Sequence, residues 1–129
     1  MESFKVKTSS REELIDITRQ VNEIVRSKNI SQGLCCIYTP HTTAAITINE
    51  NADPTVRSDI IKGLSHLNFE SVSFRHMEGN SPAHLKSSIF GCSETVIIQN
   101  NNLQLGTWQG IYFCEFDGPR NRKVFVEVK

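Results

Sequence analysis

The chain has 129 residues, of which 38% are hydrophobic and 22% charged, and its 14 basic and 14 acidic side chains balance. This length and composition are typical of one globular domain that needs no disulfides to hold its core. The neutral charge argues against a broad surface for nucleic acid or anionic membrane, and leaves room for a local pocket for a small phosphate. Neither a signal-peptide pattern nor an apolar run of roughly 20 residues occurs, so we expect a cytoplasmic protein.

The first third of the chain predicts a strand followed by a long helix. Residues 4–8 alternate apolar and polar side chains, which is typical of a half-buried strand. Ser9 or Ser10 is a candidate N-cap, and Glu12 and Glu13 would follow in the first helical turn, where the helix dipole favours acids. Apolar residues then recur at helical spacing, so an amphipathic helix is predicted to run to about Lys28: Leu14, Ile17, Val21, Ile24 and Val25.

The middle of the chain predicts two strands and a second helix. Residues 33–39 and 44–49 form apolar, partly alternating runs on either side of a Pro40-His41-Thr42 connection. Asp53-Pro54 is a strong helix start, with Asp as N-cap and Pro at the first helical position. Apolar residues at helical spacing follow it: Val56, Ile60, Ile61, Leu64 and Leu67.

The last part of the chain is predicted to be mainly β structure. Residues 79–82 form a loop by their turn chemistry, and residues 83–90 are compatible with a short helix that ends at Gly91. Residues 94–99, 108–116 and 122–128 are rich in β-branched and aromatic side chains, and Asn100-Asn101-Asn102 marks a turn.

Together these elements predict an α+β fold: a mostly antiparallel sheet or sandwich with two main helices, in a compact single domain over residues 1–129. Short turns between the last three strands predict antiparallel pairing among them. We expect the helices to cover one side of the sheet or sandwich.

The four cysteines contain no Cys-x-x-Cys pair, which argues against a thiolate zinc site or a thioredoxin-type redox site. We expect all four to be small core or near-core residues: Cys35, Cys36, Cys92 and Cys114.

Histidine is the residue type with the clearest chemical potential. His41 lies between two strands, whereas His76 and His84 flank the loop at 79–82, which can fold back and bring them together. Converging imidazoles suit zinc or another borderline divalent ion, and three of them leave a fourth position for water. The alternative is that they are isolated polar residues on the surface. His66, near the end of the second helix, has a sufficient structural explanation in the helix dipole.

The nearby carboxylates divide into two groups. Glu50 and Glu78 are loop residues and are candidates for a general base or for accepting a proton from a metal-bound imidazole. Asp53 is explained as an N-cap and Asp59 as part of an exposed helix face.

Cationic and hydroxyl side chains suggest where a phosphate would bind. Lys86, Ser87 and Ser88 follow His84 and are candidates for phosphate contacts, with the solvated face of a short helix as the alternative. Arg120 follows a tight turn and is a candidate anion clamp, with a surface salt bridge as the alternative. Trp108 is a residue type found more often in cores and interfaces than as a ligand platform.

Several motifs spread over nearly the whole chain occur together in one order. They are His41-Thr42-Thr43-Ala44-Ala45; Asn49 to Pro54 with Asp59; His76 with Glu78-Gly79-Asn80; Ala83 to Ser88 with Gly91; Leu105 to Gln109; and Glu115 to Arg120. In this combination the chain resembles the YjbQ-like family, also named the secondary thiamine-phosphate synthase family. One departure is the turn before Leu103, which usually contains glycine and here is Asn100-Asn101-Asn102.

The resemblance implies a homotrimer with a pocket near the subunit interface that often holds a metal. It implies His41, His76 and His84 as the ligands of a divalent ion, with zinc expected. The other polar residues that it implies for the site are Asn49, Glu50, Lys86, Ser87, Trp108 and Arg120.

The resulting hypothesis is a metal-dependent enzyme that acts on a small phosphorylated metabolite, with weak thiamine-phosphate synthase activity. Glu50 or Glu78 would move protons, and Lys86 with Arg120 would neutralise phosphate charge. The alternatives are a non-catalytic, trimeric protein that binds a small anion or metabolite, and a purely structural trimer. No nucleic-acid or membrane partner is expected.

Overall fold

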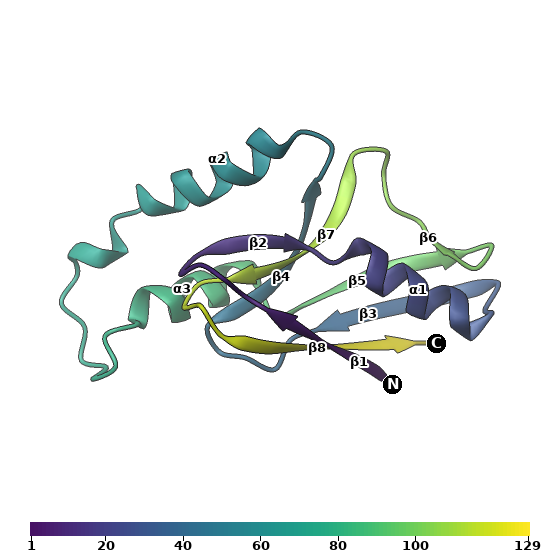
Figure 1. Cartoon of the computed structure of the whole chain (residues 1–129), viewed down its shortest axis with the longest axis horizontal. Coiled ribbons are helices and arrows are strands. Elements are labelled where there is room, and N and C mark those ends of the chain that lie inside the picture. Colours follow the sequence, from purple (N-terminus) through teal and green to yellow (C-terminus); the bar gives the residue numbers. More distant parts are fainter.

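The computed structural model describes residues 1–129 and is built on two antiparallel sheets (Figure 1). The five-stranded sheet has the order β1 (Glu2–Lys7), β8 (Asn121–Val128), β3 (Gln32–Tyr38), β5 (Ser93–Gln99) and β6 (Asn102–Leu103). The three-stranded sheet has the order β2 (Glu13–Asp16), β7 (Gln109–Glu115) and β4 (Ala44–Glu50). The predicted α+β class with a mostly antiparallel sandwich is therefore confirmed.

The helices are α1 (Thr18–Lys28), α2 (Pro54–Ser65), the short 3-10 helix η1 (Phe69–Ser71) and α3 (Ser81–Phe90). As predicted, Asp53 caps α2: its Oδ1 accepts the Thr55 N–H at 2.9 Å. His66 forms the other cap of α2, so its expected structural role is confirmed. The compatible segment 83–90 is indeed helical, and Gly91 ends α3 with φ of +91°. The predicted loop over residues 79–82 is too long, because Ser81 and Pro82 already belong to the first turn of α3. None of these helices combines the length and the hydrophobicity needed to cross a lipid bilayer.

The predicted start of the first helix is wrong. Residues 13–16 form strand β2, which pairs with β7 from Glu13 opposite Glu115 to Asp16 opposite Tyr112. The Glu13 carboxylate does not sit in a helical turn; it accepts the backbone N–H groups of Ser9 and Ser10, each at 2.7 Å. A strand is favoured here because Leu14 and Ile15 point to opposite faces, and each face of this sheet is covered by apolar side chains.

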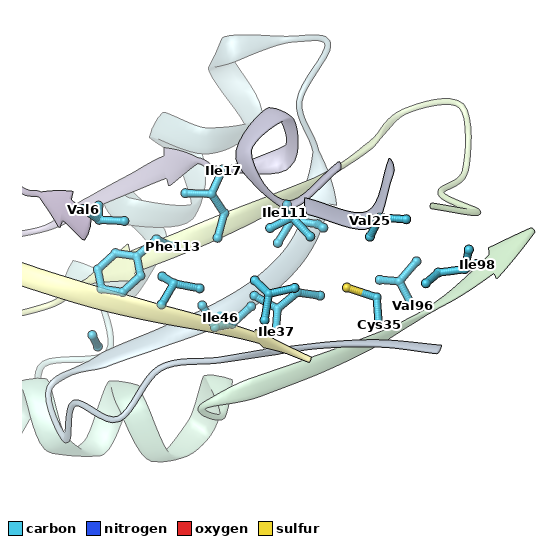
Figure 2. Close-up of a cluster of buried hydrophobic side chains, with 14 residues drawn as sticks. Val6, Ile17, Val25, Cys35, Ile37, Ile46, Val96, Ile98, Ile111 and Phe113 are labelled. Carbon is cyan, nitrogen blue, oxygen red and sulfur yellow. The ribbon is translucent and has the colours of Figure 1, made fainter. Parts of the chain in front are cut away.

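The main core fills the space between the two sheets and is closed by α1 (Figure 2). Ile37 and Val126 enter it from the five-stranded sheet, Ile46 and Phe113 from the three-stranded sheet, and all four are fully buried. Helix α1 adds its one apolar stripe, with its N-cap residue Ile17 and its residues Val21 and Val25 completely buried. This sandwich arrangement fixes the strand ends, from which the polar loops described below emerge.

A second, smaller cluster covers the outer face of the three-stranded sheet. Ala45, Tyr112 and Cys114 point outward from the sheet, and Ala83 of α3 packs on them. Partly buried residues of α2 complete the cover: Ile60, Ile61 and Leu64. The expectation that the helices cover one side is therefore wrong, because α1 packs against the inner core and α2 and α3 against the outer face.

The pairing of the last strands also differs from the prediction. Residues 93–99, 109–115 and 121–128 are strands, but β7 belongs to the three-stranded sheet and β5 and β8 to the other, where β3 lies between them. The turn between β5 and β6 is confirmed, since Asn100 and Asn101 take φ of +53° and +59°, a conformation that asparagine tolerates.

The four cysteines are all free thiols in three kinds of environment: buried, half-buried and exposed. Cys35 and Cys114 are buried as expected, and burial raises the pKa of the Cys35 thiol to about 11. Cys36 is half-buried. Cys92 is exposed, so its expected core or near-core placement is wrong; it lies just beyond α3, where the chain leaves the helix to enter β5.

Candidate functional site

One polar pocket gathers most of the chemistry predicted from the sequence. It has a volume of about 410 Å³ and is lined by residues from three connections: the loop before β4, the start of α3 and the turn between β7 and β8. Figure 1 shows the path of these connections in the ribbon. We call this hollow the histidine pocket, and it is lined by His41, His76, Glu78, His84, Asp117 and Arg120, with Pro40, Thr42, Thr43, Asn80 and Arg122 completing the wall. Apart from Pro40, every lining side chain is polar.

A buried ion pair lies behind the wall of this pocket, which Arg122 helps to line. Glu115, at the end of β7, is fully buried, and its carboxylate receives hydrogen bonds from the Arg122 guanidinium, with Nε at 2.8 Å. Thr8 Oγ1 at 2.9 Å and the Asp117 N–H at 3.0 Å donate to the same carboxylate. Burial opposes ionisation of Glu115, but these hydrogen bonds and the charge of Arg122 outweigh it and hold its pKa below its ordinary value. Arg122 also donates to Thr43 Oγ1 at 2.9 Å, which ties β8 to the start of β4.

A second group of polar residues lies closer to the opening of the pocket. Asp117 accepts hydrogen bonds from Asn80 Nδ2 at 2.8 Å and from Arg120 Nη2 at 3.0 Å. Burial opposes ionisation of Asp117, but these two donors outweigh it and lower its pKa. Asn80 Nδ2 also lies 3.4 Å from the Glu78 carboxylate, so both neighbours fix the amide group with its nitrogen toward the acids.

Asn80 therefore presents an acceptor that nothing in the chain uses. Its side chain is 8% exposed, and its Oδ1 is buried without a hydrogen-bond partner. An unpaired buried acceptor costs about 1–3 kcal/mol. Asn80 is one of the residues that line the histidine pocket, so this unsatisfied acceptor lies in the pocket wall.

The histidines of the pocket fall into two states. The rings of His76 and His84 meet edge to face with centroids 5.3 Å apart, and no hydrogen bond within the chain engages either ring. His41 is engaged: its Nε2 accepts the Lys123 N–H at 3.0 Å, so the neutral ring carries its proton on Nδ1. Burial, together with the charge of Arg122, lowers the pKa of His41 and keeps it in this neutral form.

This arrangement does not supply a complete metal site within one chain. No group of three or more His, Cys, Asp and Glu side chains comes close enough to hold an ion. His76 and His84 offer free ring nitrogens, but the one unprotonated nitrogen of His41 is already occupied by Lys123. Three histidines share one pocket, as the sequence indicated, and zinc coordination by all three stays a prediction.

The structure separates the predicted phosphate contacts. Arg120 and Glu78 line the histidine pocket, and Ser87 lies beside it, with its hydroxyl donating to the Ala44 carbonyl at 2.6 Å. Lys86 points elsewhere: it is 3% exposed and its Nζ is 2.8 Å from Glu12 Oε2, on a different hollow between α2 and α3. Both predicted alternatives for Lys86 are therefore wrong: its side chain neither lies on a solvated helix face nor lines the histidine pocket.

Three other predicted site residues lie at the far end of the three-stranded sheet. Asn49 and Glu50 end β4, whose start lies at the pocket, so about 20 Å of extended strand separates them from it. Trp108 precedes β7, pairs through its carbonyl with the Asn51 N–H, and is 62% exposed. Within one chain these residues do not meet the histidines.

The sequence argument did not assign a site role to four of the residues that shape the pocket: Asn80, Glu115, Asp117 and Arg122. Asn80 and Asp117 were attributed to turns, and Glu115 and Arg122 to strands. A signal was present in the sequence. Glu115 and Arg122 lie within predicted strands of the sandwich, and charged residues in such strands are buried only when they are paired.

Comparison with known proteins assigns the chain to a family. The family described as UPF0047 protein YjbQ-like matches residues 2–129, so the chain belongs to the YjbQ-like UPF0047 family. UPF0047 protein MJ1081 of Methanocaldococcus jannaschii is 54% identical over 97% of this chain and 91% of its own length. UPF0047 protein YugU of Bacillus subtilis is 50% identical over 99% of this chain and 98% of its own length.

Solved structures of the same family share the fold. A YjbQ/UPF0047 family protein from Clostridium acetobutylicum superimposes with a TM-score of 0.97 at 50% identity, and all of both chains is covered. The protein APE1520 from Aeropyrum pernix gives a TM-score of 0.93 at 38% identity over 99% of this chain and 96% of its own.

Proposed function

We propose that the histidine pocket binds a small phosphorylated metabolite and that the chain is an enzyme acting on it. The observation that carries this proposal is the meeting of a cation, a helix N-terminus and two unengaged imidazoles in one pocket of otherwise polar lining. The pocket of a single chain lacks a complete metal ligand set, so the chemistry below is that of the chain's own side chains.

Anion binding follows from two features of the pocket. Arg120 uses Nε and Nη2 to hold Asp117, which fixes the guanidinium plane while Nη1 stays available to an oxyanion. Helix α3 begins at Asn80 without a side-chain cap and without an acidic residue in its first turn. No group of the helix's own first turn neutralises the positive end of its dipole, which favours a phosphate against the charge of the Glu78 and Asp117 carboxylates beside Asn80.

Proton transfer would fall to His76 and His84. Neutral imidazole accepts a proton and imidazolium donates one near neutral pH, and neither ring is committed to another residue. In thiamine-phosphate formation, a carbon–nitrogen bond joins the thiazole phosphate to the pyrimidine while the carbon–oxygen bond to pyrophosphate breaks. Arg120 would stabilise the departing pyrophosphate. We propose this reaction as a weak activity of the same pocket.

Calorimetric titration with inorganic phosphate tests the binding step. We expect Arg120→Ala to lower the affinity about tenfold, equivalent to about 1.4 kcal/mol. Arg19→Ala is the matched control, since Arg19 is exposed on α1 and pairs only with Glu23 of the same helix. Equal affinities in the wild type and Arg120→Ala would contradict the proposed site.

Turnover separates an enzyme from a binding protein. The assay mixes the protein with thiazole phosphate and pyrimidine pyrophosphate and measures thiamine phosphate; His84→Ala is expected to abolish product while the thermal melt stays cooperative. A protein that binds these phosphates with wild-type affinity but releases no product would instead support the non-catalytic, metabolite-binding function.

We also propose that the chain assembles as a homotrimer, the state implied by the family resemblance. Support comes from the outer face of the five-stranded sheet, where the paired residues Leu34 and Ile97 are 53% and 62% exposed. A contiguous apolar face of this kind marks an interaction surface. Light scattering is expected to give about three times the chain mass, and Ile97→Lys to reduce it; a monomeric wild type would contradict the proposal.

A further inference from the structure

A second hollow adjoins the histidine pocket and shares a wall with it. It has a volume of about 540 Å³ and is lined at its far side by Tyr38, Thr39, Ser88 and Cys92. Pro40, His41, Thr42 and His84 line both hollows. We call this second hollow the thiol pocket. The two hollows therefore adjoin along these residues, with His41 and His84 at their junction, and we call the pair of hollows the groove.

The two halves of the groove differ in charge. The histidine pocket contains Glu78, Asp117, Arg120 and Arg122, whereas no Asp, Glu, Lys or Arg lines the thiol pocket. The thiol pocket instead offers the Tyr38 ring, a proline ring and an exposed thiol. An ionised group placed there would lose water without gaining a charged partner, so this half of the groove suits an uncharged group.

Some hydroxyl groups of the thiol pocket are already occupied. Thr39 Oγ1 donates to the Lys123 carbonyl at 3.2 Å, and Ser87 Oγ donates to Ala44. Thr42 and Ser88 are exposed and make no side-chain hydrogen bond within the chain. The free surface of this hollow thus combines ring and thiol contacts with two hydroxyls, which fits a ring that carries a few polar atoms.

We infer that the ligand of this groove is an organic phosphate ester bound across both halves. Its phosphate lies in the histidine pocket against Arg120, and its uncharged, ring-bearing group extends past His84 into the thiol pocket. This inference rests on the proposed function and adds the class of substrate and its direction in the groove. It places the bond between phosphate and organic group beside the two imidazoles at the junction. Inorganic phosphate alone would fill only one half.

A pair of probes tests this orientation: inorganic phosphate and phenyl phosphate, titrated by calorimetry. We expect the wild type to bind phenyl phosphate at least tenfold more tightly than inorganic phosphate. Cys92→Trp fills the thiol pocket and is expected to remove this difference while inorganic phosphate still binds. Cys92→Ser keeps the volume of the pocket and should retain the preference, and Arg19→Ala, on the exposed side of α1, is the unrelated control.

The outcomes separate this inference from the proposed function. If neither probe binds, both fail. If inorganic phosphate binds but phenyl phosphate binds no better, or if Cys92→Trp leaves the preference intact, the orientation is wrong and the phosphate site stands. If Cys92→Trp does not fold, alkylation of wild-type Cys92 by iodoacetamide, followed by peptide mapping, tests the same point. Phenyl phosphate should slow the alkylation several-fold, and inorganic phosphate should not. Equal labelling rates with both would overturn the inference.

Discussion

The two ends of the three-stranded sheet each hold a carboxylate with several hydrogen-bond donors, but only one end forms a pocket. At the histidine end, Glu115 is fully buried and pairs with the Arg122 guanidinium. At the far end, Asp16 is half-buried and accepts only neutral donors: Thr18 Oγ1 at 2.6 Å, the Thr18 N–H at 2.9 Å and Asn51 Nδ2 at 3.0 Å. Similar chemistry therefore serves different purposes at the two ends.

The two ends differ in whether the polar groups around the carboxylate have atoms without a hydrogen-bond partner. Around Asp16, Thr18 and Asn51 direct their donors to the carboxylate, and this network joins β2, α1 and β4. Around Glu115, the ion pair supports further polar groups whose atoms have no partner in the chain, namely Asn80 Oδ1 and the rings of His76 and His84. A buried network that leaves acceptors unpaired indicates a binding site, and one that uses its groups fully indicates a structural role.

The largest expected effect is on the buried ion pair. Glu115→Ala leaves the Arg122 charge buried without its partner and should lower the free energy of unfolding by about 3–5 kcal/mol. Asp16→Ala removes a half-buried carboxylate and leaves the neutral donors of Thr18 and Asn51 without their acceptor, which should cost about 1–3 kcal/mol. Chemical denaturation measures both, with Glu127→Ala as control because Glu127 is exposed and pairs only with the N-terminus. Equal losses in the Glu115 and Asp16 variants would remove the contrast between the two ends.

Acid pH should destabilise the fold through the same groups. Burial opposes ionisation of Glu115 and Asp16, but their hydrogen bonds outweigh it and hold both pKa values below the ordinary range. The stabilisation they provide is therefore complete above about pH 4.5 and is lost as the pH falls through the lowered pKa values. Unfolding measured between pH 7 and pH 2.5 should show this loss, and Glu115→Ala should flatten the curve. A wild-type stability that does not fall below pH 4 would contradict the lowered values.

A glycine tests how tightly the far end is packed. A Cβ placed on Gly110 would collide with the Asn51 side chain, which would have to leave Asp16. Gly110→Ala should therefore destabilise the protein by about 1–3 kcal/mol. Gly63→Ala is the matched control: no atom lies within 4 Å of its added Cβ in α2, and alanine should stabilise the helix by about 0.5–1 kcal/mol. A melt of Gly110→Ala as high as that of the wild type would mean that Asn51 moves without cost.

Zinc titration distinguishes the two histidine states. Because His41 Nε2 already accepts the Lys123 N–H, we expect His41→Ala to leave zinc affinity within about threefold and His76→Ala to lower it about tenfold, or about 1.4 kcal/mol. His66→Ala controls for surface imidazoles, since His66 caps α2 away from the pocket. Equal loss in His41→Ala and His76→Ala would instead support coordination by all three rings that line the pocket.

The sequence predicted those parts of the fold whose signals are local. The Asp53-Pro54 start of α2 and the asparagine turn after β5 both depend on neighbouring residues, and both are confirmed. The helix predicted over residues 12–17 failed because β2 is defined by its partner β7, almost 100 residues away. Apolar residues that cover both faces of a sheet resemble those of a helix over so short a run.

In the site, too, features with local sequence signals were predicted and features that depend on distant residues were not. His41, His76 and His84 line one pocket, as predicted, because the turn at Gly79 brings His76 back beside His84 of α3. The motif around Lys86 could not show where its side chain points. That direction is set by the ion pair with Glu12, a residue 74 positions earlier in the chain. Glu50 was predicted to lie near the histidines because its motif lies between theirs in the family pattern. In the structure, β4 runs away from the histidine pocket and carries Glu50 to its far end.

The smallest expected effects compare the two predicted general bases directly. Glu78 lies in the histidine pocket, so Glu78→Gln removes a negative charge near the phosphate and should raise its affinity two- to fivefold, or about 0.4–1 kcal/mol. Glu50, at the far end of β4, has a backbone carbonyl that accepts the Tyr112 hydroxyl, and Glu50→Gln should leave phosphate affinity unchanged. Calorimetry measures both. If Glu50→Gln changes the affinity as much as Glu78→Gln, the carboxylate must reach the histidine pocket of another copy, since about 20 Å of strand separates it from its own. The two ends of the sheet would then be halves of one site shared between subunits.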